Sequence, residues 1–167
     1  MGKIGIFYGS STGNTEEAAK LIGEKLGVPS EDIHDIYKLK ASPADYDVLL
    51  LGSSSTGSGD LQDDWETFLE TLKETDLKGK KIALFGLGDS STFSDTFLGA
   101  TGKIYDALKD SGATFIGTGV STDGYTFDES EAVVDGAFVG LPLDADNESD
   151  LTEGRIDAWV EKLKSEL

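Results

Sequence analysis

The regular alternation of short apolar runs with amphipathic helical stretches is the feature that most constrains the fold of this 167-residue chain. The spacing predicts helices over 15–26, 62–72, 99–111 and 149–167. Strand-like apolar runs occupy 3–8, 32–37, 47–51, 81–85, 113–116 and 137–143. Because strands that alternate with helices form a parallel sheet covered on both faces, the sequence predicts an α/β protein with three α/β/α layers.

One long polar segment interrupts this alternation. Residues 118–136 lie between two strand-like runs, and loops of that length are usually functional or inserted. The chain has no repeat, low-complexity tract or linker, so we expect a single domain over residues 1–167.

Composition excludes several kinds of chemistry. With no Cys, the chain has no donors for disulfides, thiol redox chemistry or Cys-ligated metals, and its single His argues against a His-based metal site or a Ser-His-Asp triad. We therefore expect no catalytic and no metal residues. No apolar stretch approaches ~20 residues and the N-terminus lacks a signal-peptide pattern, so we expect a cytoplasmic protein. Lys and Arg number 14 against 32 Asp and Glu, and the net charge of −18 argues against nucleic acids and anionic membranes and favours a basic partner.

A hydroxyl-rich turn follows the first strand and opens the first helix. A helix N-terminus favours an anion, and hydroxyl and amide donors suit a phosphate monoester. The turn lacks the Lys of a nucleotide-hydrolysing loop and the glycine spacing of a dinucleotide fingerprint. The alternative is a Ser/Thr-rich helix cap without a ligand. The candidate phosphate-binding residues are Ser10, Ser11, Thr12, Gly13, Asn14 and Thr15.

Two further loops follow the third and fourth strands. Residues 52–61 are rich in Ser and Gly, and we expect them to form a loop rather than a strand, with a merely flexible connection as the alternative. In residues 86–93, Asp89 could accept a hydrogen bond from a ring N–H and Phe93 could stack on a ring. The alternative is that Asp89 caps a helix and Phe93 belongs to the core.

Taken together, the three loops predict one binding site. Open α/β sheets bind ligands at the carboxyl ends of their strands, where all three loops begin. Phosphate donors in one loop and a ring platform in another suit a ligand with a phosphate at one end and a flat heterocycle at the other. With no nucleophile–base pair in the three loops, the cofactor would supply the chemistry.

Five motifs make the sequence similar to the long-chain flavodoxins over essentially its whole length. They occupy residues 10–15, 59–65, 85–89, 121–127 and 138–147. The resemblance implies a five-stranded parallel sheet in the order 2-1-3-4-5, whose fifth strand is split by an inserted loop at about 118–137. Flavodoxins are themselves a standard example of ligand binding at the switch point of such a sheet.

The resemblance also implies a function. Flavodoxins bind FMN non-covalently and act as low-potential one-electron carriers that use the semiquinone/hydroquinone couple, without a substrate of their own. The implied partners are basic-surfaced redox proteins: a ferredoxin/flavodoxin-NADP reductase or a photosystem as donor, and a reductase-type enzyme as acceptor. We expect a monomer.

By position, residues 10–15 would bind the FMN phosphate, and the second and third loops would lie along the flavin. The further residues implied to bind the cofactor are Ser55, Thr56, Gly57, Ser58, Gly59, Leu87, Gly88, Asp89, Phe93, Thr96 and Asp146. Many relatives stack a Trp and a Tyr on the two flavin faces, where this chain has Thr56 and Phe93. We therefore expect weaker FMN binding than in relatives with both aromatic side chains.

Other interpretations remain open at this point. An FMN-dependent quinone reductase of the same fold would need a second substrate site beside the flavin, which nothing in the sequence indicates. A phosphoryl-accepting receiver would need acidic residues after the first strand, where this chain has hydroxyls.

Carboxylates beside the second loop, Glu66 and Glu70 among them, are expected to lower the second reduction potential of the flavin. His34 is predicted on a surface strand, and Trp65 and Trp159 in the core.

Overall fold

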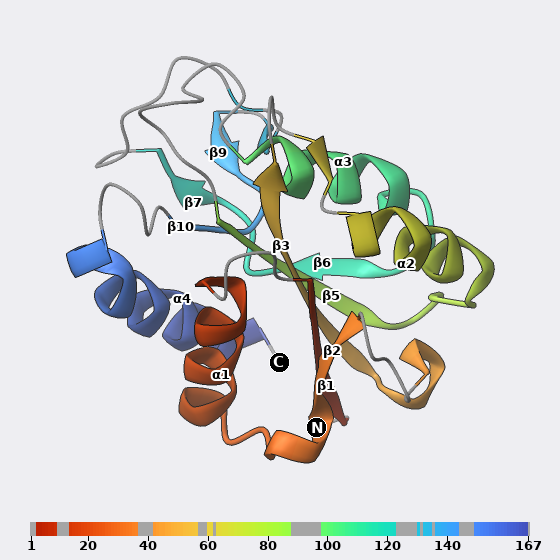
Figure 1. The fold of residues 1–167 in the computed structure, drawn as a ribbon, viewed down its shortest axis with the longest axis horizontal. Coiled ribbons are helices and arrows are strands. Elements are labelled where there is room, and N and C mark those ends of the chain that lie inside the picture. The colour runs from red at the N-terminus through yellow and green to blue at the C-terminus, as the bar shows by residue number, and fades with distance from the viewer. Residues whose placement is uncertain are drawn as a thin grey trace.

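A central parallel sheet lies between two layers of helices in the computed structural model (Figure 1). The structure describes residues 3–9, 14–36, 42–56, 60–61, 63–87, 98–122, 130, 132–134, 136–143 and 149–166. Within these ranges, no helix is both long and apolar enough to cross a membrane.

The strand order of the main sheet is β10-β5-β3-β1-β2, and β6 also pairs with β5. All of these pairs are parallel. The strands are β1 (Ile4–Gly9), β2 (Ile33–Asp35), β3 (Val48–Thr56), β5 (Lys81–Leu87), β6 (Thr114–Ile116) and β10 (Leu141–Leu143). Because β6 pairs with the start of β5 and β10 with its end, the two are halves of one split strand. The predicted order 2-1-3-4-5 and the split fifth strand are confirmed.

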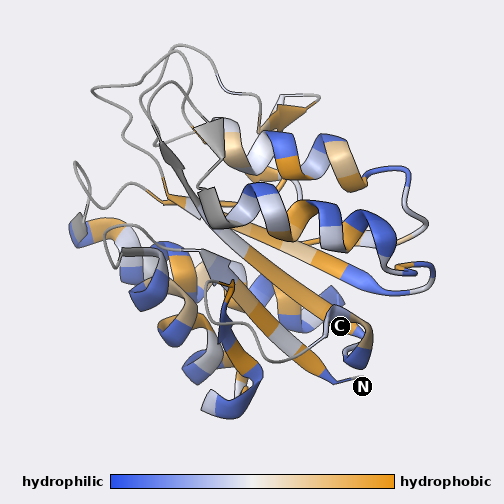
Figure 2. Cartoon of the chain, turned by 45° about the vertical axis from the view of Figure 1, so that its right-hand side comes forward, coloured by the Kyte–Doolittle hydropathy of each residue, from blue (hydrophilic) through white to orange (hydrophobic). Residues whose placement is uncertain are grey.

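Each face of the sheet is covered by a pair of helices (Figures 1 and 2). One pair is α1 (Asn14–Leu26) and α4 (Thr152–Glu166), and the other is α2 (Asp63–Glu74) and α3 (Gly99–Leu108). Side chains of β3 alternate between the two cores: Leu49 and Leu51 pack with Trp65, whereas Val48 and Leu50 pack with Trp159. Trp65 is fully buried and Trp159 nearly so, which confirms that both belong to the core.

The short 3₁₀ helices are η1 (Ser30–Asp32), η3 (Pro43–Asp45) and η4 (Ser149–Leu151).

The prediction that residues 52–61 form no strand is wrong. β3 continues to Thr56, and β4 (Asp60–Leu61) pairs antiparallel with its end. Ser53 pairs with Gly9 on one side and Gly86 on the other, and it is buried. Two neighbouring strands thus bond to the backbone of this serine-rich segment, and those bonds outweigh its low strand propensity.

The single strand predicted over 137–143 is two strands in two sheets. β9 (Ala137–Phe138) pairs antiparallel with β7 (Val120–Ser121) and β8 (Val133–Val134), whereas β10 joins the main sheet. At Gly140, between them, an added Cβ would lie 2.2 Å from the carbonyl oxygen of Leu84, so the chain passes directly against β5. The segment predicted as a long polar loop therefore contains β7 and β8.

Candidate functional site

Three adjacent strands end side by side at the carboxyl edge of the sheet. The register places Gly9 of β1 beside Ser53 of β3, and Ser53 beside Gly86 of β5. On the far side of β5, Leu87 pairs with Leu143, the last residue of β10. β1, β3 and β5 thus end at the same edge of the sheet, where the sequence predicts one shared site.

Thr15 provides the clearest binding feature at this edge. It is the second residue of α1, and its side chain is 1% exposed. Within the described structure, its Oγ1 atom is buried without a hydrogen-bond partner. A buried hydroxyl without a partner is costly, and at a helix N-terminus it lies where the helix dipole favours an anion. An anionic group bound here would accept a hydrogen bond from the Thr15 hydroxyl, which has no acceptor among the described residues.

Trp65 fixes the strand that leads into the second loop. Its indole Nε1 donates a hydrogen bond to the carbonyl oxygen of Gly52 at 2.7 Å, and its ring packs edge-on against Phe68 of α2 at 5.1 Å between centroids. An added Cβ on Gly52 would lie 2.1 Å from the ring of Phe85. β3 is therefore held from both faces at Gly52, four residues before it ends at Thr56. Sequence reasoning assigned Trp65 to the core and missed this hydrogen bond.

Tyr8 is the titratable side chain next to the end of β1. Burial, together with the nearby carboxylates of Glu16 and Asp35, raises the pKa of Tyr8 to about 12. The phenol is therefore neutral at physiological pH and supplies no base. Among the residues that the structure describes, no group of three or more His, Asp or Glu side chains could hold a metal ion.

The structure places only some of the predicted site residues. Thr15 and Leu87 are fully described, and Leu87 is buried at the end of β5. For Asn14, Ser55 and Thr56 the backbone is described, at the start of α1 and the end of β3. The predicted residues outside the described ranges are Ser10, Ser11, Thr12, Gly13, Gly57, Ser58, Gly59, Gly88, Asp89, Phe93, Thr96 and Asp146. Their assignment to the site stays a prediction.

Comparison with known proteins identifies the family. The flavodoxin family model matches residues 6–159. The chain belongs to the flavodoxin family. It is 42% identical to a flavodoxin from Nostoc sp. over 166 residues, covering 99% of this chain and 97% of that one. Its identity to flavodoxin 1 of Escherichia coli is 43% over 169 residues, covering 100% and 96%. The crystal structure of Fusobacterium nucleatum flavodoxin bound to flavin mononucleotide matches with a TM-score of 0.91 at 31% identity, covering 100% and 99%.

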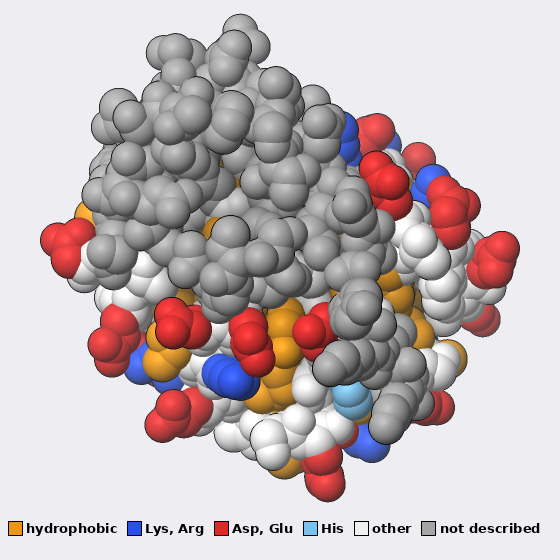
Figure 3. Space-filling view, in the orientation of Figure 1, with side chains coloured by type: hydrophobic (Ala, Val, Ile, Leu, Met, Phe, Trp, Pro, Cys, Tyr) orange, Lys and Arg blue, Asp and Glu red, His pale blue; other side chains and the backbone are white. Residues whose placement is uncertain are grey.

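Among the charged side chains on the described surface in Figure 3, the acidic ones outnumber the basic ones. Several exposed carboxylates are paired within a helix, as in the ion pairs Glu16–Lys20 and Glu70–Lys73 at 3.1 and 3.4 Å. With 32 acidic and 14 basic residues, the chain has a net charge of −18. The protein therefore has a negative field, which a flavodoxin-type carrier would present to any redox partner.

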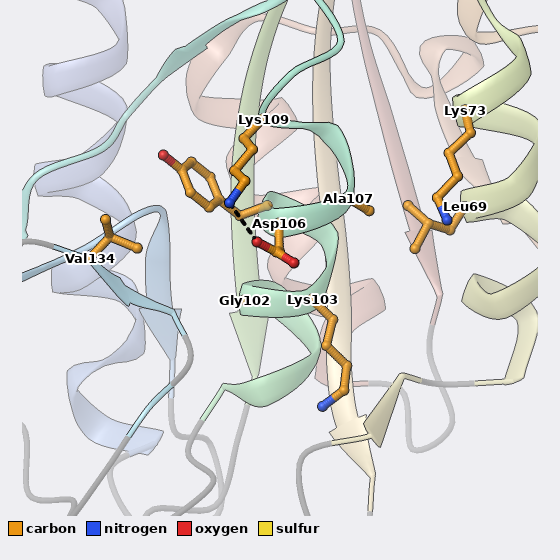
Figure 4. Close-up of a pocket in the computed structure, with 9 residues that line it drawn as sticks. Leu69, Lys73, Gly102, Lys103, Asp106, Ala107, Lys109 and Val134 are labelled. Atoms are coloured by element: carbon orange, nitrogen blue, oxygen red, sulfur yellow. Dashed lines mark ion pairs between the residues drawn. The ribbon is translucent and has the colours of Figure 1, made fainter.

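A cleft of about 690 Å³ lies along α3, between α2 and β8 (Figure 4). Lys73, Lys103 and Lys109 line it, but Lys73 lies 3.4 Å from Glu70 and Lys109 lies 2.8 Å from Asp106. None of the described residues that line it is one that the sequence assigns to the cofactor.

Proposed function

We propose that this protein is an FMN-binding electron carrier in which residues 1–167 form one cofactor-binding domain. When bound, FMN supplies the redox chemistry, and the protein binds, orients and shields it. The observation that carries the proposal is the buried hydroxyl of Thr15, which has no partner among the described residues, at the N-terminus of α1. This helix follows β1 at the carboxyl edge of the sheet, near which Gly9, Ser53 and Gly86 of β1, β3 and β5 pair.

The hydroxyl of Thr15 would donate to a phosphate oxygen, and the residues at 10–14 would supply further donors. Leu87 ends β5 at the same edge and would contact the flavin together with residues of the second and third loops. Residues 55–59, 88–89, 93, 96 and 146 complete the proposed cofactor site. Thr56 in place of the Trp found in many relatives would weaken binding on one flavin face.

Affinity measurements with FMN and riboflavin test the role of Thr15. Thr15→Val keeps the shape of the side chain and removes the hydroxyl. A hydrogen bond to a charged group contributes about 1.5–3 kcal/mol, so FMN affinity should fall roughly 10- to 150-fold. Riboflavin lacks the phosphate, and its affinity should stay unchanged.

Thr101→Val is the matched control for this experiment. The Thr101 hydroxyl is equally buried and also unpartnered in the described structure, but it packs against Gly86 in the core between α3 and β5. FMN affinity should be unchanged in this variant. The assignment of Thr15 to the phosphate would be contradicted if both variants lost the same FMN affinity. It would also be contradicted if Thr15→Val lost as much affinity for riboflavin as for FMN.

We further propose that the carrier has no substrate of its own and exchanges electrons with basic-surfaced redox proteins. The negative field disfavours approach of the anionic nicotinamide cofactors. The FMN-loaded protein alone should not oxidise NADPH with a quinone acceptor, and adding a flavodoxin reductase should start turnover. Steady NADPH oxidation by the protein alone would favour the quinone reductase instead.

A further inference from the structure

Two separate links join the end of β3 to the start of α2. Trp65, the third residue of α2, donates from its indole Nε1 to the carbonyl oxygen of Gly52 at 2.7 Å. Between these two residues, the end of β3 pairs antiparallel with β4, so that Thr56 lies opposite Asp60. The chain from residue 52 to residue 65 is therefore closed on itself, with the indole hydrogen bond at its base and the paired strands beyond.

The base of this closed segment is tightly packed. Trp65 is fully buried, and its ring packs edge-on against Phe68 at 5.1 Å between centroids. Phe68 in turn stacks on Phe7 of β1 at 5.5 Å. Gly52 is paired with both neighbouring strands, β1 and β5. The indole N–H thus reaches from a packed helix to the centre of the sheet, and the core fixes its direction.

The far part of the closed segment has fewer contacts with the sheet. The last residue of β3 that pairs with β1 is Ser53, and the last that pairs with β5 is Ser54. Among the described strands, Ser55 and Thr56 pair only with β4, which has two residues. Because an isolated two-stranded hairpin is marginal in water, this pair depends on how its two arms are held. β3 itself holds one arm, and α2, tied to β3 by Trp65, holds the other.

We propose that Trp65 is a positioning residue for the flavin ring: through Gly52 and β4 it holds Ser55 and Thr56 in the arrangement that the ring contacts. This inference rests on the proposed function, in which these two residues lie along the flavin. A binding segment that is already ordered loses less entropy when the ligand binds, so the indole hydrogen bond raises the affinity for the ring. The proposed phosphate site lies at the start of α1, so Trp65 acts on the ring end of the cofactor.

Trp159 provides a matched control. Its indole Nε1 also donates to a glycine carbonyl, that of Gly117, at 2.9 Å, and its ring is buried in the core on the other face of the sheet. Neither residue is proposed to contact FMN. Trp65→Phe and Trp159→Phe each remove one buried indole hydrogen bond and keep an aromatic ring. A difference between the two variants in flavin affinity therefore reports the position of the bond and not its general contribution to stability.

Calorimetric titration of the flavin-free protein with FMN and with riboflavin tests the proposal, at a temperature where every variant is folded. Trp65→Phe should weaken binding of both flavins by the same factor, about two- to tenfold, the range that one neutral hydrogen bond allows. Trp159→Phe should leave both affinities unchanged.

The proposal would be overturned if both variants had the same effect, if Trp65→Phe bound flavin like the wild type, or if it lost affinity for FMN alone. Each of these results leaves FMN binding by the wild type intact, so the proposed function would stand. A wild-type protein that binds neither flavin would refute the proposed function and this inference with it.

Hydrogen exchange followed by mass spectrometry tests the same link without the cofactor. In the flavin-free protein, residues 52–65 should exchange faster in Trp65→Phe than in the wild type or in Trp159→Phe. β4 also lies close to α3, so we expect the segment to loosen rather than unfold. Unchanged exchange of residues 52–65 would overturn the proposal. If Trp65→Phe does not fold, 3-benzothienylalanine at position 65 keeps the shape of the ring and replaces only the N–H by sulfur, and both measurements apply to it.

Discussion

At the scale of single residues, the base of the candidate site depends on the absence of a side chain at Gly52. The ring of Phe85 occupies the space where a Cβ on residue 52 would lie, at 2.1 Å, and the Gly52 carbonyl accepts the Trp65 hydrogen bond. Both neighbours are buried and cannot move freely. The glycine is thus required by packing against the sheet, independently of the loop that follows.

We predict that Gly52→Ala lowers the free energy of unfolding by about 1–3 kcal/mol, the usual cost of overpacking a core. Urea denaturation at a fixed, saturating FMN concentration measures it. Adding Phe85→Leu should recover part of the loss, because the smaller side chain leaves room for the methyl group. The changes in unfolding free energy of the two single variants can be added and compared with that of the double variant. If the double variant is no more stable than this sum predicts, the contact is contradicted.

Gly154→Ala is the opposite case on α4. An added Cβ there meets nothing within 4 Å, and the glycine is exposed in a helix. Replacing a helical glycine by alanine should stabilise the protein by up to about 1 kcal/mol. The same urea measurement checks this, and a loss of stability would show that residue 154 has a contact that the structure does not contain.

Residue chemistry alone led to the assignment of Thr15, because it lies in a hydroxyl-rich turn that opens a helix. The structure buries this hydroxyl at the start of α1, and its role in binding stays a prediction. The hydrogen bond of Trp65 to Gly52 could not be predicted, because it joins residues 13 apart whose contact depends on how α2 packs across β3. Local patterns report the type of a residue, whereas such contacts follow from tertiary packing.

At the scale of elements, a cluster around His34 joins β2 to the segments before β3. The Tyr46 hydroxyl donates to Asp32 at 3.0 Å, and His34 Nε2 lies 2.7 Å from the Tyr46 oxygen, so His34 donates to it. The His34 ring also lies 5.1 Å from that of Phe7 on β1. His34 is half-buried rather than on the surface as the sequence predicted, because Tyr46 covers it.

This cluster predicts a pH dependence of stability. Burial lowers the pKa of His34 from 6.5; the ammonium of Lys3 also lowers it, and the carboxylate of Asp32 opposes both. The unfolded chain therefore binds a proton at a higher pH than the folded protein does, so stability is complete above about pH 6.5 and falls as the pH drops toward the lowered value. The His34→Gln variant should lack this loss of stability at low pH.

Unfolding free energies of wild type and His34→Gln should be compared between about pH 8 and pH 5 at saturating FMN. The wild-type advantage should shrink steadily below about pH 6.5. Curves that stay parallel over the whole range would contradict a lowered pKa at His34.

Element boundaries show where the sequence pattern stops being informative. The serine-rich end of β3 has no apolar run, and it is a strand only because β1 and β5 flank it. The run at 137–143 is continuous in sequence, yet the close approach of Gly140 to β5 divides it between two sheets. Central strands such as β1 and β5 were predicted to within two residues at each end because their own side chains fill both cores.

At the scale of the whole molecule, the net charge of −18 sets the approach of a partner. The candidate site lies at the carboxyl edge of the sheet, where α2 begins after β4. Glu66 lies in the first turn of α2 and is exposed, so its charge belongs to this edge. Glu161 lies in the second half of α4, whose last turn reaches Lys81 at the opposite edge: the Lys81 ammonium donates to the Glu166 carbonyl at 2.9 Å. Glu66 and Glu161 therefore lie toward opposite edges of the sheet, and replacing each one tests at which edge a partner docks.

We predict that electron transfer from the reduced protein to cytochrome c, a basic acceptor, slows as ionic strength rises from about 0.02 to 0.3 M, because salt screens the attraction. Stopped-flow rate constants measure this. Glu66→Gln and Glu161→Gln reduce the net charge equally, so a uniform field would give them equal rates. If partners dock at the carboxyl edge, Glu66→Gln should slow the reaction more and flatten its salt dependence more than Glu161→Gln does. A larger effect of Glu161→Gln would place the docking surface at the other end of the sheet, away from the site proposed for FMN.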